Sequence, residues 1–268
     1  MLFTTPESQA GVFPPLLDPL DASQVISFQF KGLTKARLSH AVLTRHGGVS
    51  RPPYNSLNTS QASGDKPEDV AKNLRVVVEV IGADHLVSMK QCHGSHVEII
   101  QDDGVESLSR PIYADALITN RKRIAIMVRL ADCQGIILFD PVKKVLANVH
   151  CGWRGNVLNI IDTTVRRMVS TCGCRARDVM AAVGPSLGPC CAEFRSYEQI
   201  FPREFRAFMV GKNTFDLWAI SRWQLRNAGL KDRNIEVAGV CTRCRTDLFY
   251  SYRGEGVTGR FAMVAMLQ

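Results

Sequence analysis

The chain has 268 residues, of which 46% are hydrophobic and 22% charged, a composition typical of a soluble globular protein with a sizeable core. No apolar run approaches the ~20 residues of a membrane span, and the start lacks the basic and continuous apolar segments of a signal peptide. We therefore expect a cytoplasmic protein without a membrane partner. The net charge of +8 is dispersed, and its densest runs, Arg121–Arg123 and Arg166–Arg167, are not interleaved with aromatics. This favours a solvated face or an anionic small substrate over nucleic acid.

The first half of the chain predicts one helix followed by a series of strands. Residues 1–22 are rich in Pro, Leu and Ser and predict an irregular N-terminal arm, and we expect a single domain over residues 23–268. The segment "PEDVAKNLRVVVEVIG" predicts a helix that begins near Pro67 and ends at Gly82. Six apolar runs then predict strands: "HLVSM", "SHVEII", "DALIT", "RIAIMVRL", "GIILFD" and "KVLANVH".

The second half mixes helices and strands. Apolar residues at helical spacing predict an amphipathic helix over residues 156–170, and "FDLWAISRWQLRNAG" predicts a second helix that ends at Gly229. The runs "DVMAAVG", "IEVAGV" and "RFAMVAML" predict further strands. The mixture predicts a single compact α/β (α+β) domain, in which mixed sheets are flanked by helices.

The stretch "NVHCGWRGN" marks the end of a strand, a turn through Gly152 and Gly155, and the start of a helix. Backbone N–H groups at a helix start are unpaired and attract anions. Arg154 adds a planar guanidinium that matches a phosphate. The plainer alternative is a glycine-rich turn with Trp153 packed against the core.

Two histidines and one cysteine occupy predicted strand ends. His93 lies in a turn between two strands, Cys133 follows the strand "IAIMV", and His150 ends the strand "KVLANVH". One thiolate and two imidazoles suit Zn²⁺, and three protein ligands leave a position open for water or substrate. The spacing of 40 residues from His93 to Cys133 and 17 to His150 is not a short metal motif, so a metal site remains one hypothesis among several.

Nine cysteines in a chain without an export signal are more typical of buried thiols, metal ligands or nucleophiles than of disulfides. A rival hypothesis therefore makes Cys133 or Cys151 a nucleophile that His150 activates. Adjacent strand residues face opposite sides, which separates His150 from Cys151 and His93 from Cys92. We expect Cys92 and Cys151 to be packing thiols.

Two further motifs allow more than one interpretation. "CTRC" (Cys241–Cys244) could belong to a structural zinc or a redox pair, but the upstream cysteines, "CGC" and "CC", do not have knuckle spacing. "LTRHGGVS" places Arg45 and His46 on a glycine loop. A plain turn is one interpretation of that loop, and contact with an anion or a sugar is the other.

Taken together, these segments resemble the YfiH-type laccase-domain family, also described as multicopper polyphenol oxidases and as purine nucleoside phosphorylases. The matching stretches are "LTRHGGVS", "SLN", "QCHGSHV", "ADALIT", "ADCQGIILFDP", "HCGWRG", "VGPSLGPCCAEF" and "CTRC" followed by "FYSYRGEGVTGRFAMVA". They run in order from about Leu43 to the C-terminus. The chain departs from the family pattern at Cys92, Cys151 and Ala192, and in "SLNTS", which puts its substrate preference in question.

The resemblance implies a compact mixed α/β fold of the CNF/YfiH type. It implies zinc bound by His93, Cys133 and His150, phosphorolysis of adenosine, inosine, guanosine and methylthioadenosine, and zinc-assisted deamination of adenosine. Purine nucleosides and phosphate are then the expected partners of a monomer or homodimer.

Phosphorolysis needs cations around phosphate, for which Arg45, Arg154 and Arg253 are the candidates. We expect Cys133, Arg154 and Asp132 to act in catalysis, with Asp132 orienting a metal ligand.

The alternatives are copper-dependent phenol oxidation, a hydrolase using Cys133 and His150, and a non-enzymatic metal or partner-binding module. Only six histidines are present and they form no H-x-H pair, which disfavours a copper cluster.

Overall fold

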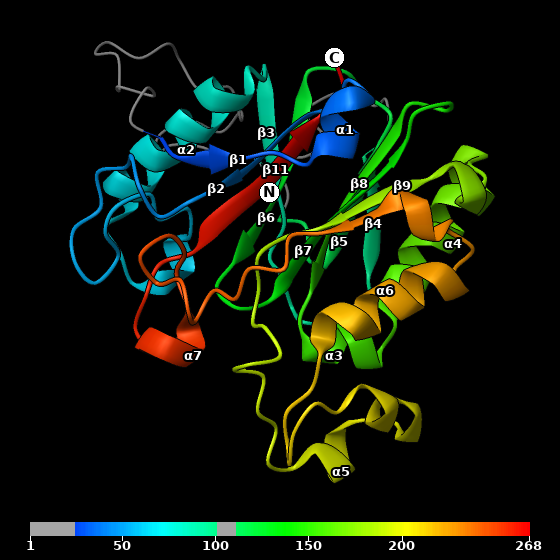
Figure 1. Ribbon diagram of the computed structural model, residues 1–268. Coiled ribbons are helices and arrows are strands. Elements are labelled where there is room, and N and C mark those ends of the chain that lie inside the picture. The colour runs from blue at the N-terminus through cyan, green and yellow to red at the C-terminus, as the bar shows by residue number, and fades with distance from the viewer. Residues whose placement is uncertain (1–24, 101–110) are drawn as a thin grey trace.

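Two mixed β-sheets pack face to face at the centre of the molecule (Figure 1). This computed structural model describes residues 25–100 and 111–268, so the predicted arm over residues 1–22 lies outside the described residues. The strands are β1 (Ser27–Phe28), β2 (Ser39–Leu43), β3 (His85–Ser88), β4 (Val97–Ile100), β5 (Ala116–Thr119), β6 (Ile124–Leu130), β7 (Gln134–Asp140), β8 (Val145–Cys151), β9 (Met180–Val183), β10 (Ile235–Val237) and β11 (Phe261–Met266).

The two sheets are both mixed, as the sequence predicted. The five-stranded sheet has the order β1-β2-β11-β6-β3, with β3 parallel to β6 and the remaining pairs antiparallel. The six-stranded sheet has the order β10-β9-β7-β8-β5-β4, and only its two outer pairs are parallel. Apolar side chains from the inner faces of both sheets form one core between them.

Helices cover the two outer faces, so that the layers run helix, sheet, sheet, helix (Figure 1). One long helix packs on the five-stranded sheet, and α4 and α6 pack on the six-stranded sheet. The helices are α1 (Lys31–Lys35), α2 (Pro67–Ile81), α3 (Trp153–Val157), α4 (Ile160–Cys172), α5 (Tyr197–Ile200), α6 (Leu217–Asn227) and α7 (Tyr252–Glu255). Among the residues that the structure describes, no helix is both long and apolar enough to cross a bilayer.

Helix α2 confirms the prediction that was made from its end signals. Pro67 lies in the first turn of α2, where its missing N–H costs no intrahelical hydrogen bond. Gly82 ends the helix in the left-handed conformation, at φ 69°. The buried side chains Val70, Leu74 and Val77 recur at helical spacing and face the sheet.

The single helix predicted over residues 156–170 is wrong, because the chain forms α3 and then α4. Asn159 interrupts the helix at φ 53°, and its side chain accepts a hydrogen bond from the N–H of Asp162. Asparagine tolerates this conformation and caps a new helix, which the apolar spacing alone does not reveal.

The predicted strands are present, but β1, β2 and the short helices α1, α5 and α7 were not predicted. β2 lies between β1 and β11 and is almost entirely buried, so the apolar run "HAVL" within it was an available signal.

Strand β8 connects the core to the functional end of the molecule. Its odd-numbered residues, Val149 among them, pack toward the helices, while Leu146 packs between the sheets. Asn148 also points inward, and its Nδ2 donates to the carbonyls of Ile126 at 3.0 Å and Met263 at 2.9 Å, in the opposite sheet. By strand alternation His150 lies on the same face as Asn148, at the edge where the sheets end.

Candidate active site

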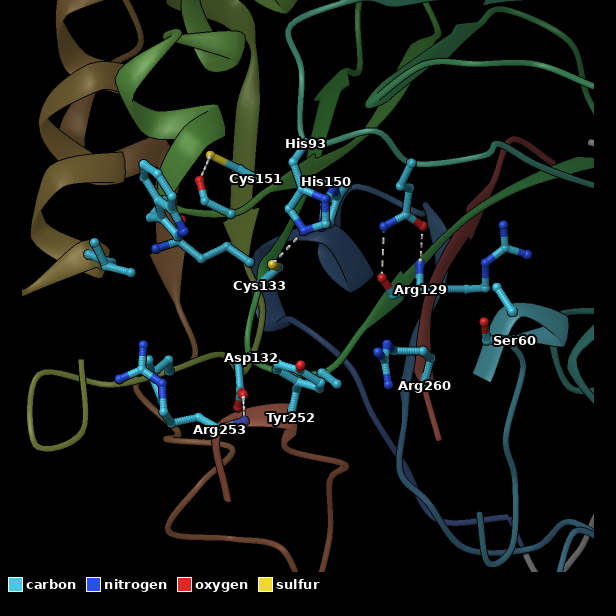
Figure 2. Close-up of a pocket in the computed structure, with 18 of the residues that line it drawn as sticks. Ser60, His93, Arg129, Asp132, Cys133, His150, Cys151, Tyr252, Arg253 and Arg260 are labelled. Carbon is cyan, nitrogen blue, oxygen red and sulfur yellow. Dashed lines mark hydrogen bonds between the residues drawn. The ribbon is translucent and has the colours of Figure 1, made fainter. Parts of the chain in front are cut away.

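Three metal-ligating side chains converge at one end of the two sheets (Figure 2). His93 follows β3, Cys133 lies in the tight connection between β6 and β7, and His150 is near the end of β8. Because β7 and β8 are antiparallel neighbours, with Gly135 opposite His150, the start of one strand lies beside the end of the other. The donor atoms of the three residues lie within 4.8 Å of one another. The structure therefore brings together the trio that the sequence singled out.

The backbone at Gly152 passes close to the side chains of Cys133 and His93. A Cβ atom at that position would lie 2.9 Å from Cys133 Sγ and 3.3 Å from His93 Cδ2. Any other residue would push these two side chains apart, so glycine is required here for steric reasons.

Asp115 holds two of the three side chains in place, and the sequence analysis did not identify it. Its carboxylate accepts hydrogen bonds from the backbone N–H groups of His93 at 2.9 Å and Gly94 at 2.7 Å. It also lies 2.8 Å from His150 Nδ1, so the Nε2 atom of that ring is left for a ligand. These contacts support the turn at His93, whose φ of 57° is uncommon outside glycine. Asp115 is the second residue of the motif "ADALIT", which was an available signal for it.

The imidazoles of the trio favour the ionised form of the neighbouring thiol. Burial alone raises the pKa of the Cys133 thiol, but the neighbouring His150 and His93 rings lower it to about 6. Burial lowers the pKa of His150, yet the Cys133 thiolate and the Asp115 carboxylate together raise it to about 9. A deprotonated sulfur is the form that binds metals and the form that acts as a nucleophile.

The donor set fits a zinc ion. Tetrahedral zinc, with Zn–S and Zn–N bonds of about 2.3 and 2.0–2.1 Å, places sulfur and nitrogen ligands about 3.5 Å apart. The distance from Cys133 Sγ to His93 Nε2 is 3.7 Å. The carboxylate on the far nitrogen of His150 is the usual outer support of a metal-bound histidine. These residues can therefore hold a metal with one position left open.

A cavity of about 970 Å³ opens beside the trio, at the upper end of the roughly 300–1,000 Å³ common for small-molecule sites. Three arginines and three aromatic residues line it: Arg129, Arg253, Arg260, Trp153, Phe194 and Tyr252. In Figure 2, Arg129 and Arg260 lie to one side of the trio and Arg253 lies across the pocket from them. The cavity therefore combines cationic and aromatic surfaces beside the candidate metal site.

The structure separates the three predicted phosphate contacts. Arg253 lines the cavity, and its Nη1 donates to the carbonyl of Glu193 at 3.0 Å. Arg45 is buried elsewhere, with its guanidinium 2.8 Å from Glu255 and above the ring of Tyr250. Arg154 is exposed beside Trp153 and is not among the residues that line the cavity.

Arg129 and Arg260 are not among the site residues predicted from the sequence. Arg129 is half-buried and donates to Ser88 and to the carbonyl of Met89, and burial lowers its pKa to about 10, so that it stays charged at neutral pH. Burial also lowers the pKa of Arg260, and the nearby Cys133 thiolate opposes that shift. Arg129 lies near the end of β6 and Arg260 lies just before β11. The position at a strand end, by which the trio was predicted, was therefore an available signal for both arginines.

Asp132 lines the cavity at a φ of 87°. Its carboxylate accepts hydrogen bonds from Thr242 Oγ1 at 2.7 Å, Ser251 Oγ at 2.7 Å and the backbone N–H of Arg253 at 2.5 Å. These bonds tie the Cys133 turn to α7, whereas Asp115 is the carboxylate that contacts the trio.

Of the two cysteines predicted to be packing thiols, only Cys151 is buried. Cys151 is 1% exposed and packs with the outer core cluster, as predicted. The prediction that Cys92 is a packing thiol is wrong, because this side chain is exposed in the loop before His93. That loop is not a strand, so residue alternation does not govern it.

The fold and the site together define a layered α/β protein with a thiol and two imidazoles at the base of a cationic cavity. The family model of the multi-copper polyphenol oxidoreductase laccases matches residues 39–268, and the chain belongs to this family.

Curated relatives carry a different functional name. The chain is 31% identical over 251 residues to a purine nucleoside phosphorylase of Bacteroides thetaiotaomicron, covering 87% of this chain and 92% of the relative. It is 35% identical over 233 residues to a purine nucleoside phosphorylase of Deinococcus radiodurans, covering 82% and 86%.

Solved structures confirm the fold. The hypothetical protein YfiH of Bacillus licheniformis is 28% identical, with a TM-score of 0.82 over 93% of this chain and 98% of that protein. YlmD of Geobacillus stearothermophilus is 26% identical, with a TM-score of 0.80 over 96% of this chain and 99% of that protein.

Proposed function

We propose that this protein is a zinc-dependent purine nucleoside phosphorylase that acts on adenosine, inosine, guanosine and methylthioadenosine and also deaminates adenosine. The observation that carries the proposal is the opening of the His93, Cys133 and His150 donor set into a cavity lined by arginines. The names of the curated relatives support the reaction class.

Phosphorolysis moves the ribose from the purine to phosphate. A phosphate oxygen attacks C1′, the bond from C1′ to the purine nitrogen breaks, and the purine leaves with the electron pair and takes up a proton. Arg129, Arg253 and Arg260 line the cavity and would hold the phosphate dianion, because guanidinium groups pair with phosphate oxygens. Trp153 and Tyr252 offer aromatic faces on which the purine can stack.

His93, Cys133 and His150 would hold the zinc ion, and the ion supplies a Lewis acid beside the substrate. The chain itself keeps Cys133 ionised, orients His150 through Asp115 and fixes Arg253 through Asp132. The proposal includes a cytoplasmic protein that acts as a monomer or homodimer, whose nine cysteines are all free thiols.

The multicopper alternative has less support. The six histidines all lie in the described residues, yet only His93 and His150 take part in a cluster that could hold a metal. His40, for example, is buried and bonded to the backbone of Phe30 and Leu38. A multicopper oxidase needs far more imidazole donors than this site supplies.

A second candidate function has a specific observation behind it. Cys133, His150 and Asp115 are connected as thiolate, imidazolium and carboxylate, the arrangement of a cysteine hydrolase. The second imidazole, His93, lies 3.7 Å from the sulfur and has no place in such a triad, which favours the metal site.

Metal analysis and a nucleoside assay with phosphate varied test the leading proposal. Adenosine should give adenine and ribose 1-phosphate only when phosphate is present, and inosine should form in its absence. Both Cys133→Ala and His93→Ala should lower each rate by more than about 100-fold, while Cys172→Ala, at the end of α4, should not. Full activity of either site variant, or copper as the sole metal, would sink the proposal. Activity that survives removal of the metal but not alkylation of Cys133 would favour the hydrolase.

A further inference from the structure

Four cysteines gather at a second place, formed by the loops that follow β9 and β10. These strands are parallel neighbours, so their carboxyl ends lie at the same edge of the six-stranded sheet. An isolated bridge between Ser186 and Cys241 continues the pairing beyond the strands, with Thr242 N donating to the Ser186 carbonyl at 3.0 Å. The adjacent pair Cys190 and Cys191 thereby meets the C-x-x-C turn, although about fifty residues separate them in sequence.

The geometry of the four sulfurs matches a tetrahedral metal centre. The Sγ atoms of Cys190, Cys191, Cys241 and Cys244 all lie within 4.8 Å of one another. Cys244 Sγ is 3.5 Å from Cys190 Sγ and 3.6 Å from Cys191 Sγ. Four thiolates around zinc, with bonds of about 2.3 Å, lie about 3.8 Å apart. All four cysteines are free, and their sulfur atoms are close enough together to bind one ion.

The surrounding backbone is arranged for thiolates. Gly188 N donates a hydrogen bond to Cys241 Sγ at 3.3 Å. A Cβ atom at Gly188 would lie 2.9 Å from the Cβ of Cys241 and 2.7 Å from the ring of Trp218, so only glycine lets the two loops approach. An N–H group aimed at sulfur stabilises its charged form. Several thiolates in one small space repel one another, and a divalent cation offsets that charge.

We propose that Cys190, Cys191, Cys241 and Cys244 bind a structural zinc ion, separate from the candidate active site. Four protein ligands leave no position open for substrate, which is the mark of a structural site. The ion joins two loops that also contact the active site. Thr242, inside the C-x-x-C turn, donates to Asp132 at 2.7 Å, and the carbonyl of Cys191 accepts from Arg253 at 3.4 Å. The second site thus supports the wall of the cavity.

Counting zinc in site-specific variants tests the proposal. Full-length protein purified under reducing conditions should contain two zinc ions per chain. His93→Ala should contain one, the double variant Cys190→Ser with Cys244→Ser should contain one, and the combination of all three should contain none. Cys172→Ser is the matched control, because this thiol lies on α4 outside both clusters, and it should keep two.

Cobalt substitution gives a second measurement that does not depend on the double variant folding. His93→Ala protein loaded with Co²⁺ should show the sulfur-to-cobalt absorption and the visible bands of a tetrahedral four-thiolate site. One zinc in the wild type with none in His93→Ala overturns the proposal. So does a His93→Ala cobalt spectrum without thiolate absorption, iron in place of zinc, or a Cys190–Cys244 disulfide in the reduced preparation.

Discussion

Among single residues, the candidate site depends on a buried side chain that does not line the cavity. Asp115 is 1% exposed, and its carboxylate joins the backbone of the His93 turn to the ring of His150. Burial raises the pKa of this carboxyl, but the hydrogen bonds from His150 and from Gly94 outweigh burial and lower it. Asp115 is therefore ionised at neutral pH and keeps both imidazoles in the orientation that a metal needs.

Replacing this carboxylate should weaken zinc binding without unfolding the protein. Asp115→Asn keeps the shape but removes the charge that supports His150, so we expect zinc affinity to fall roughly 10–100-fold. Competition with a chelator of known affinity measures the change. Asp84→Asn is the control, since that exposed carboxylate pairs with Arg123 far from the trio, and its affinity should match the wild type. Equal affinities in both variants would contradict the role given to Asp115.

At the scale of elements, the short helix α7 carries two cavity residues and is held from behind by Arg45. Glu255, at the end of this helix, accepts hydrogen bonds from Arg45 at 2.8 Å, Thr258 at 2.9 Å and Ser251 N at 3.0 Å. Arg45 thus supports the helix that carries Tyr252 and Arg253 into the lining of the cavity. Its role is to stabilise α7, whereas the sequence predicted a contact with phosphate.

Neutralising Glu255 should destabilise the protein in a pH-dependent way. Burial raises the pKa of Glu255, but its hydrogen bonds and Arg45 lower it below the ordinary 4.5. The stabilisation is therefore complete above pH 4.5 and is lost as the pH falls through the lowered pKa. Glu255→Gln should lower the free energy of unfolding by about 1–2 kcal/mol at pH 7, with a difference that shrinks below pH 4.5.

Denaturant unfolding at several pH values measures this difference. Glu198→Gln is the control, because its carboxylate is 68% exposed and lies 3.8 Å from Arg206, so its loss should cost less than about 0.5 kcal/mol. If the loss of unfolding free energy in Glu255→Gln stays constant down to pH 3, the charge of Glu255 is not the source of the stabilisation.

At the scale of the whole molecule, the cavity lies where both sheets and several distant loops meet. Its lining residues span the sequence from Ser60 to Arg260. A metal held by the trio would connect the two sheets, since His93 follows β3 of one sheet and His150 lies near the end of β8 in the other. Metal binding is therefore expected to stabilise the entire fold.

Removing zinc should lower the melting temperature. Free zinc at a hundredfold excess over its Kd stabilises a protein by about 2.7 kcal/mol, and each kcal/mol corresponds to about 2–4 °C in a chain of this size. We expect a gain of about 5–10 °C for each occupied zinc site when zinc is returned to metal-free protein, and none with magnesium. Scanning calorimetry checks this. His93→Ala should keep a smaller gain through the four-cysteine site, and an unchanged melting temperature in every sample would refute both metal sites.

The sequence is sufficient to predict most of the local elements, because each depends on residues that are near in the chain. Pro67 and Gly82 delimit α2, and apolar runs mark the buried strands. It also placed His93, Cys133 and His150 at strand ends, although the resemblance to a family was needed to choose zinc over a nucleophile. Asn159 shows where local reasoning failed, since one capping side chain divided a helix that apolar spacing made continuous.

Which distant residues meet depends on how the strands pair in three dimensions. Pairing of β9 with β10 brings two cysteine motifs together that have no knuckle spacing in sequence. Arg45 is buried in an ion pair with Glu255 and does not line the cavity, whereas Arg129 and Arg260 do. Strand order and register set these distances, and both depend on contacts between segments that are far apart in the chain.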